Sequence, residues 1–155
     1  MGIERELPVV AKKKAKVVVR RAAMVAARGT RVLLAQRIEG GTFGGMWEPP
    51  SVDAAASDLP AALRALVGME VRVLEPVADV VHVLTHRRLE VMVYRGTLGP
   101  RLSAKDDGVA ATLGRRDYQS FRWQDPAEGG SFGVTTFARK ILAAALGQKL
   151  RFHST

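Results

Sequence analysis

The chain has 155 residues, 47% of them hydrophobic and 25% charged, which suits one globular domain with a buried core. It contains no cysteine and only three histidines, which excludes disulfides, thiolate metal sites and thiol nucleophiles and disfavours a histidine metal cage. The net charge of +9 and the lack of any apolar run near the roughly 18 residues of a membrane span predict a soluble, cytoplasmic protein with anionic partners and no membrane partner.

The positive charge gathers near the N-terminus of the sequence. Nine lysines and arginines and no acid lie between Glu6 and Glu39, whereas the remaining basic residues equal the 15 acidic ones in number. Residues 1–16 lack apolar periodicity, so they are interpreted as a basic tail or an interdomain linker. Contact with nucleic-acid phosphates is one role for this segment, and a solvated linker is the other. The lysines concerned are Lys12, Lys13, Lys14 and Lys16.

A globular domain is predicted over residues 17–150, with a short tail at 151–155. Runs of Val, Ala and Leu predict strands over 17–27 and 32–35. Arg28-Gly29-Thr30 lies between them and has the composition of a turn, so the two strands are expected to form a hairpin.

A loop and a helix follow this hairpin. Residues 39–50 are too rich in Gly and Pro for regular structure and indicate a long, shaped loop. Apolar residues at helical spacing predict a helix over 58–67, with Ser57 or Asp58 as its N-cap and Gly68 at its end.

The second half of the domain predicts three more strands and a closing helix. In chain order these are strands over 71–83 and 89–98 joined at residues 85–87, an irregular stretch over 99–117, an edge strand over 118–123 and a helix from Thr135 or Thr136 to Ala145. This order predicts a mixed sheet covered by helices on both faces.

The order of elements resembles the Nudix fold, as do four short features: Arg37, Trp47, Glu48 and a helix ending in Gly68-Met69. The resemblance implies an α/β (α+β) fold, an α/β/α sandwich with a mixed β-sheet. The hydrolase signature of that fold is G-x5-E-x7-R-E-U-x-E-E-x-G-U. Its glutamates hold the magnesium ions that bridge a diphosphate.

The carboxylates of this signature are missing from the sequence. When the signature is anchored on the Gly-Met pair, Ala61-Ala62 stand at its Arg-Glu pair and Ala65-Leu66 stand at its metal-binding Glu pair. No acid lies between Leu59 and Met69, so a shift of one or two residues does not restore the site. Asp58 is interpreted as a helix cap and Asp53 as a loop carboxylate. We therefore expect no catalytic residue, no metal and no cofactor.

Three segments resemble the C-terminal, Nudix-like domain of MutY-type adenine DNA glycosylases. They are Val-Leu-Leu-Ala-Gln-Arg with Gly-Gly-Met-Trp-Glu-Pro-Pro (32–37 and 44–50), His-Val-Leu-Thr-His-Arg-Arg-Leu (82–89) and Thr-Thr-Phe-Ala-Arg-Lys-Ile-Leu (135–142). In that family a separate helical domain performs base excision, and the Nudix-like domain recognises 8-oxoguanine opposite adenine. The resemblance implies DNA containing 8-oxoguanine and a helical glycosylase domain as partners, and a cytoplasmic, nucleoid-associated location.

Carried over residue by residue, the resemblance implies three groups of site residues. Base recognition falls to Leu84, Thr85 and His86. The pocket loop contributes Phe43, Trp47 and Glu48. Arg87 and Arg88 join the N-terminal lysines on DNA phosphates. Two positions depart from the family pattern, since Leu84 stands where an aromatic is common and Pro50-Ser51 replaces Gly-Gly.

Other functions and structural roles stay open. A Nudix hydrolase of a nucleoside diphosphate derivative would need displaced carboxylates, such as Glu48, Asp53, Glu90 or Asp106. A nucleotide-sensing or protein-binding relative would use the same pocket without catalysis. Purely structural roles are a core position for Trp47, a structural histidine at His82 and a solvated surface at Arg87 and Arg88.

Overall fold

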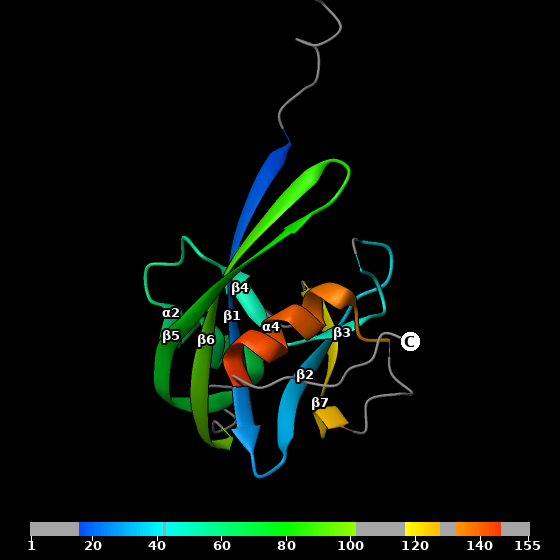
Figure 1. Cartoon of the computed structure of the whole chain (residues 1–155). Helices are drawn as coiled ribbons and strands as arrows, with labels where there is room; N and C mark the ends of the chain where they lie inside the picture. Colours follow the sequence, from blue (N-terminus) through cyan, green and yellow to red (C-terminus); the bar gives the residue numbers. More distant parts are fainter. Residues whose placement is uncertain (1–15, 42, 102–116, 128–132, 147–155) are drawn as a thin grey trace, which may run out of the picture.

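The computed structural model describes residues 16–41, 43–101, 117–127 and 133–146 as a mixed sheet with helices packed against it (Figure 1). In chain order its elements are β1 Val17–Arg28, β2 Arg31–Arg37, β3 Trp47–Glu48, β4 Ser51–Asp53, α2 Leu59–Val67, β5 Met69–Val83, β6 Arg87–Arg101, β7 Tyr118–Gln124 and α4 Thr136–Leu146. No helix within these ranges is long and apolar enough to cross a membrane.

The seven strands form one sheet in the order β3-β2-β1-β6-β5, with β4 paired to β1 and β7 paired to β2. β1 runs parallel to β6 from Val17 to Ala26, and the other pairings are antiparallel. The sheet is therefore mixed, as the sequence predicts. β7 pairs only with β2 in the part of the chain that the structure describes, so it is an edge strand, also as predicted.

The central strand β1 divides the core into two layers. Its residues from Ala22 to Ala26 are all buried, and alternate side chains point to opposite faces. Ala23 and Val25 pack with α4 on one face, whereas Met24 and Ala26 pack with α2 on the other. A strand covered on both sides reads as a continuous apolar run, which is why β1 lacks hydrophobic alternation. The arrangement is the α/β/α sandwich that the sequence predicts.

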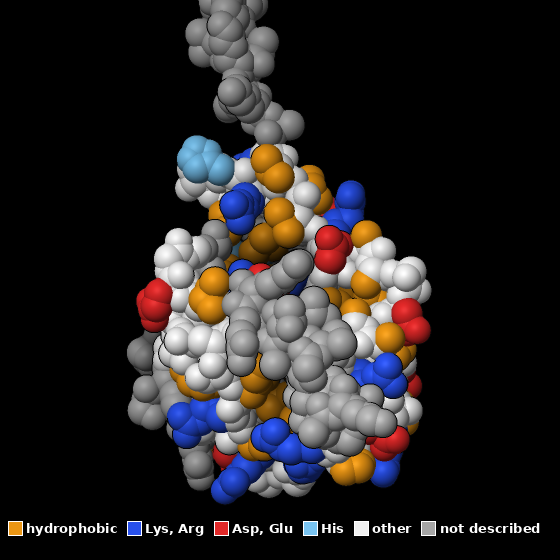
Figure 2. All heavy atoms as spheres, turned by 180° about the vertical axis from the view of Figure 1, so that it is seen from behind, with side chains coloured by type: hydrophobic (Ala, Val, Ile, Leu, Met, Phe, Trp, Pro, Cys, Tyr) orange, Lys and Arg blue, Asp and Glu red, His pale blue; other side chains and the backbone are white. Residues whose placement is uncertain are grey.

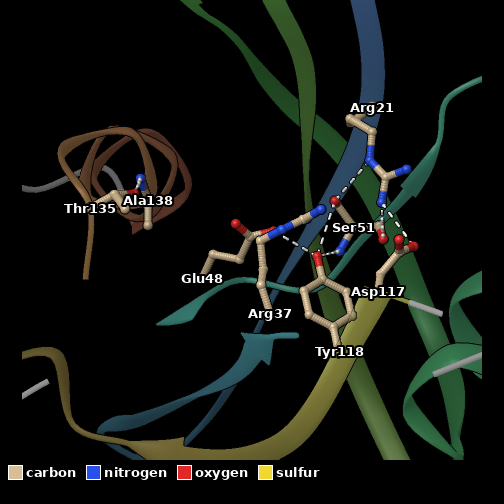
Figure 3. A network of polar contacts seen from close by, with 8 residues as sticks. All are labelled: Arg21, Arg37, Glu48, Ser51, Asp117, Tyr118, Thr135 and Ala138. Carbon is tan, nitrogen blue, oxygen red and sulfur yellow. Dashed lines mark hydrogen bonds and ion pairs between the residues drawn. The ribbon is translucent and has the colours of Figure 1, made fainter. Parts of the chain in front are cut away.

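Both helices begin at the caps that the sequence indicates. The Asp58 carboxylate accepts a hydrogen bond from the Ala61 N–H at 3.0 Å, and Gly68 ends α2 in the left-handed region at φ 71°. At α4 the Thr135 hydroxyl accepts from the Ala138 N–H at 3.0 Å (Figure 3). The burial of Leu63, a large apolar residue of α2, contributes about 1.5–3 kcal/mol to folding.

The structure differs from the predicted elements in several places. The short strand β4 is not predicted, and β6 continues to Arg101, so residues 99–101 are strand where an irregular stretch is predicted. The loop over 39–50 contains a short strand, β3, which pairs with β2. The predicted hairpin of β1 and β2 is present, but only two residue pairs join the strands, Ala27 with Val32 and Arg28 with Arg31. Along most of its length β1 pairs with β6 and not with β2. Because β6 lies far from β1 in the sequence, local sequence patterns do not reveal this pairing.

One end of the sheet projects beyond the helices. The turn Leu84–His86 joins β5 to β6, and the start of β1 lies alongside β6 there (Figure 1). We call this three-stranded projection, residues 17–20 and 81–90, the finger. It carries the segment that resembles the base-recognition turn of MutY-type domains.

Candidate functional site

The tip of the finger is held by three backbone and side-chain contacts. The Leu84 N–H donates to the Arg87 carbonyl at 2.7 Å and closes the turn. The Lys16 ammonium donates to the Leu84 carbonyl at 2.6 Å, and the Val17 N–H donates to the His86 carbonyl at 3.2 Å. Thr85 and His86 are exposed, whereas Leu84 is half-buried against the α4-side core. The contacts therefore fix the backbone and present the threonine and histidine to solvent.

The two faces of the finger carry different side chains because successive residues of β6 alternate. Arg88 lies on the face away from α4, where its Nε is 2.8 Å from the Glu90 carboxylate, and Arg20 reaches the same carboxylate at 3.2 Å. The hydrogen bond from Arg88 lowers the pKa of Glu90, and Arg20 adds to that effect. Seen from behind, hydrophobic and basic side chains lie together on the projection (Figure 2).

On the α4 side, the base of the finger forms one wall of a pocket of about 230 Å³. Its apolar lining comes from the strands and from α4: Val19, Leu89, Val91, Phe137 and Ile141. The loop before β3 adds Phe43, whose ring centroid is 5.9 Å from that of Phe137. Phe43 has φ 61°, a conformation that costs free energy for a residue other than glycine. The fold holds this ring over the pocket despite that cost.

Three arginines also line this pocket: Arg21, Arg37 and Arg87. Arg37 Nη1 is 3.3 Å from the Glu48 carboxylate, which is itself buried and lines the pocket. Burial acts to lower the pKa of Arg37, but the charge and hydrogen bond of Glu48, together with Tyr118 and Asp117, outweigh burial and raise the pKa. The pocket therefore combines an apolar floor with an excess of fixed positive charge.

A largely buried network of polar contacts holds Arg21 and Arg37 in place beside the pocket (Figure 3). The Tyr118 hydroxyl donates to Glu48 at 2.6 Å and accepts from the Ser51 N–H at 3.1 Å. Arg21 donates to the Ser51 carbonyl at 2.7 Å and lies 3.8 Å from the Asp117 carboxylate. Burial, followed by the charge of Glu48, raises the pKa of Tyr118 far above its ordinary value. Tyr118 therefore stays a neutral donor, and β7 is tied to β3 and β4.

His82 lies on β5 near the aromatic pair at the pocket. Its ring centroid is 5.1 Å from Phe137 and 6.3 Å from Phe43. Burial, and then the charge of Lys140 on α4, lower the pKa of His82. This environment is that of a packed histidine and matches the structural role considered for it from the sequence.

The predicted site residues fall into two groups in space. Phe43 and Glu48 line the pocket, and Arg87 does so as well. Trp47 packs against the α4-side core, with the Arg122 guanidinium 5.6 Å from the centre of its ring, and is outside the pocket lining. The finger carries Leu84, Thr85, His86, Arg87 and Arg88, and Lys16, just before it in the chain, reaches its tip through the Leu84 carbonyl. Lys12, Lys13, Lys14 and Asp106 lie outside the described residues.

Sequence reasoning missed three members of the polar network. Tyr118 was visible only as part of a strand, Ser51 only as a departure from a family pattern, and Arg21 only as one basic residue among many. Each acquires its role through contacts with segments 30 or more positions away. The one available signal was that Arg37 and Glu48 recur together in the Nudix resemblance.

The residues on α2 do not fit a magnesium site of the hydrolase type. The helix has the sequence Leu-Pro-Ala-Ala-Leu-Arg-Ala-Leu-Val and carries no carboxylate. Asp58 is used as its cap, and Asp53 accepts a hydrogen bond from the Ala55 N–H at 2.8 Å. Among the described residues no three His, Cys, Asp or Glu side chains gather as metal ligands. We derive no hydrolytic step through a metal.

Comparison with known protein families identifies the family to which this fold belongs. A family model described as the NUDIX domain matches residues 21–144. The chain belongs to the NUDIX domain family. The match covers β1 from Arg21 onward, α2, the turn Leu84–His86 and α4 as far as residue 144. Residues 17–20 of the finger lie outside it.

Solved structures similar to this NUDIX domain include hydrolases and binding domains. A MutT NUDIX hydrolase from Burkholderia pseudomallei is 14% identical with a TM-score of 0.63, covering 83% of this chain and 98% of its own. The C-terminal domain of mouse MUTYH, in complex with human PCNA, is 20% identical with a TM-score of 0.56, covering 83% and 87%. The NUDIX domain of Shewanella oneidensis NrtR, complexed with ADP ribose, is 13% identical with a TM-score of 0.55, covering 92% and 97%. At these identities the likeness shows the fold.

Proposed function

We propose that this NUDIX domain reads 8-oxoguanine opposite adenine in DNA and does not hydrolyse a nucleotide. The observation that carries the proposal is the finger tip, where exposed Thr85 and His86 lie among basic residues at the end of a projecting strand pair. The absence of any carboxylate on α2 supports a binding role over a hydrolytic one.

The chemistry of Thr85 suits the lesion. 8-Oxoguanine differs from guanine by a hydrogen-bond donor at N7 and an added oxygen at C8, and a hydroxyl can both donate and accept. One well-placed contact of this kind gives about 1–3 kcal/mol of discrimination. Lys16 and Arg88 flank the tip and are suited to phosphate contacts, which position a protein on DNA without reading sequence.

We propose a helical glycosylase catalytic domain as the second partner. The mouse MUTYH neighbour is a C-terminal domain, and the resemblance of residues 82–89 and 135–142 is to the same class. In such an arrangement this domain supplies lesion recognition, and excision of adenine belongs to the partner. Linking two weak binding modules raises their combined affinity without any new contact.

Equilibrium binding tests the proposal. Fluorescence anisotropy would compare labelled duplexes with 8-oxoguanine or guanine opposite adenine, each over a salt series, for wild type and Thr85→Ala. We expect tighter binding of the lesion duplex by the wild type and a loss of about 1–3 kcal/mol of that preference in Thr85→Ala. Thr30→Ala is the matched control because Thr30 is an exposed threonine at the β1–β2 turn, outside the finger. Equal affinity of the wild type for both duplexes would contradict the proposal.

A second candidate function is binding of a small anionic ligand in the pocket. The observation that favours it is the lining itself, with three arginines above an apolar floor and Phe43 and Phe137 at one side. Concave sites with a few convergent polar groups are the usual binding sites for small molecules. Calorimetric titration with ADP ribose, a ligand named for the NrtR neighbour, tests this candidate. Heat of binding that disappears in Arg37→Ala would support it.

A further inference from the structure

We infer that the pocket is an effector site whose occupation by a small anion weakens DNA binding by the finger, because Arg87 belongs to both. The inference rests on the proposed DNA-reading function. Under this inference, DNA binding by the finger and anion binding in the pocket oppose each other within one domain. The ligand class is a phosphate ester or related anion that carries a flat ring.

The placement of Arg87 carries the argument. It begins β6 directly after the Leu84–His86 turn, and its carbonyl accepts the hydrogen bond that closes that turn. Its side chain lines the pocket together with Leu89 and Val91, the next residues of β6 on the same face. A ligand in the pocket therefore contacts the strand that carries the finger tip.

Arg88 provides the internal comparison. It is the neighbour of Arg87 on the same exposed part of β6, but its guanidinium lies on the opposite face, bonded to Glu90. Arg88 is absent from the pocket lining. The two arginines carry the same charge and are adjacent in β6, one residue apart in their distance from the tip, and only Arg87 lines the pocket.

The lining defines the ligand by charge and shape. Arg21, Arg37 and Arg87 line the pocket, and the carboxylates near them are Glu48, 3.3 Å from Arg37, and Asp117, 3.8 Å from Arg21. Three positive charges against two negative ones favour an anion. Arginine guanidinium groups match the geometry of phosphate oxygens. Phe43 and Phe137 lie at the pocket with centroids 5.9 Å apart and offer aromatic contact to a ring. The cavity of about 230 Å³ limits the ligand to a small molecule.

The sign of the coupling follows from electrostatics. A bound anion attracts the Arg87 guanidinium and reduces the positive potential at the base of the finger, so DNA phosphates are bound less well. By linkage, DNA must weaken the anion by the same factor. Coupling between sites of this kind is about fivefold or more in affinity.

The experiment measures the affinity for the 8-oxoguanine duplex by anisotropy, with and without guanosine monophosphate. Sulfate at equal ionic strength is the reference, because salt alone weakens DNA binding. Calorimetry measures the affinity for guanosine monophosphate without DNA, and inorganic phosphate in a second titration separates anion binding from recognition of the ring. We expect the duplex to bind about fivefold or more weakly with the nucleotide than with sulfate.

Three variants locate the coupling. Arg87→Ala is expected to bind guanosine monophosphate more weakly and to lose the effect of the nucleotide on DNA. Arg88→Ala is expected to bind DNA more weakly but to keep that effect. Phe43→Gly, which relieves the φ 61° backbone and removes the ring, is expected to need more nucleotide for the same effect.

The outcomes distinguish failure of this inference from failure of the proposed function. An affinity for the 8-oxoguanine duplex that guanosine monophosphate does not change relative to sulfate, although calorimetry shows that the nucleotide binds, would overturn the coupling alone. Absence of any heat of binding for guanosine monophosphate would also overturn the coupling alone. Equal loss of coupling in Arg87→Ala and Arg88→Ala would overturn the role of Arg87. Absence of any lesion preference in the wild type would overturn the proposed function and the inference together.

Discussion

At the scale of single residues, the hydroxyl of Tyr118 holds the most consequential contact in the network. It is fully buried and donates to the Glu48 carboxylate, whose remaining described partner is Arg37. Tyr118→Phe removes the donor and leaves a buried carboxylate less satisfied, so we expect a loss of about 1–3 kcal/mol in the free energy of unfolding. Urea denaturation measures it. Tyr94→Phe on β6 is the control, and an equal loss in both variants would contradict the importance of the Glu48 contact.

His82 gives the domain a specific pH dependence. Burial and Lys140 lower its pKa in the folded state, so the unfolded chain binds a proton more readily. This stability is fully present above the ordinary histidine pKa of 6.5 and is lost as pH falls through the folded pKa. We expect His82→Gln to reduce the drop in thermal midpoint between pH 7.5 and pH 5. An unchanged drop in His82→Gln, matching that of the control His86→Gln, would contradict the account.

Residue roles differ in how far the sequence could predict them. Asp58, Thr135 and Gly68 act on backbone groups within four positions, so local patterns identified them. Tyr118 and Arg21 act on segments far away in the chain, and their roles depend on how the strands assemble. Local spacing does not contain that information.

At the scale of elements, α2 depends on its cap because it is only nine residues long. We expect Asp58→Ala to lower the free energy of unfolding by about 1 kcal/mol, whereas Asp58→Asn, which can still accept from the Ala61 N–H, costs less. Thermal or urea denaturation of the two variants checks this. If Asp58→Asn were as damaging as Asp58→Ala, the carboxylate charge and not the cap would be the stabilising feature.

The strands and helices followed from the sequence more closely than their pairing did. Predicted strands at 71–83 and 118–123 and both predicted helices agree with β5, β7, α2 and α4 to within two residues at each end. The parallel pairing of β1 with β6 did not follow, because these strands lie about 70 positions apart and any two apolar strands fit such a pairing equally well. The contact of Arg87 with the pocket is a consequence of that pairing and was equally hidden.

At the scale of the whole molecule, the fold separates two surfaces that meet at one strand. The finger projects from one end of the sheet (Figure 1). The pocket is lined by residues of α4 and of the base of the finger. The sequence analysis named the turn residues Leu84, Thr85 and His86 and the loop residues Phe43 and Glu48 as candidates, but not that the two groups would lie on different surfaces. Family membership follows from the match over residues 21–144, and DNA reading by the finger is the proposal that the arrangement supports best.

The most direct test of this account compares two substitutions of Thr85. Thr85→Ser keeps the hydroxyl, and Thr85→Val keeps the shape without it. The measurement is the ratio of dissociation constants for duplexes with guanine and with 8-oxoguanine opposite adenine, at one fixed salt concentration. We expect Thr85→Ser to retain most of the wild-type preference and Thr85→Val to lose about 1–3 kcal/mol of it. A wild-type preference that Thr85→Val retains in full would contradict base reading by this hydroxyl.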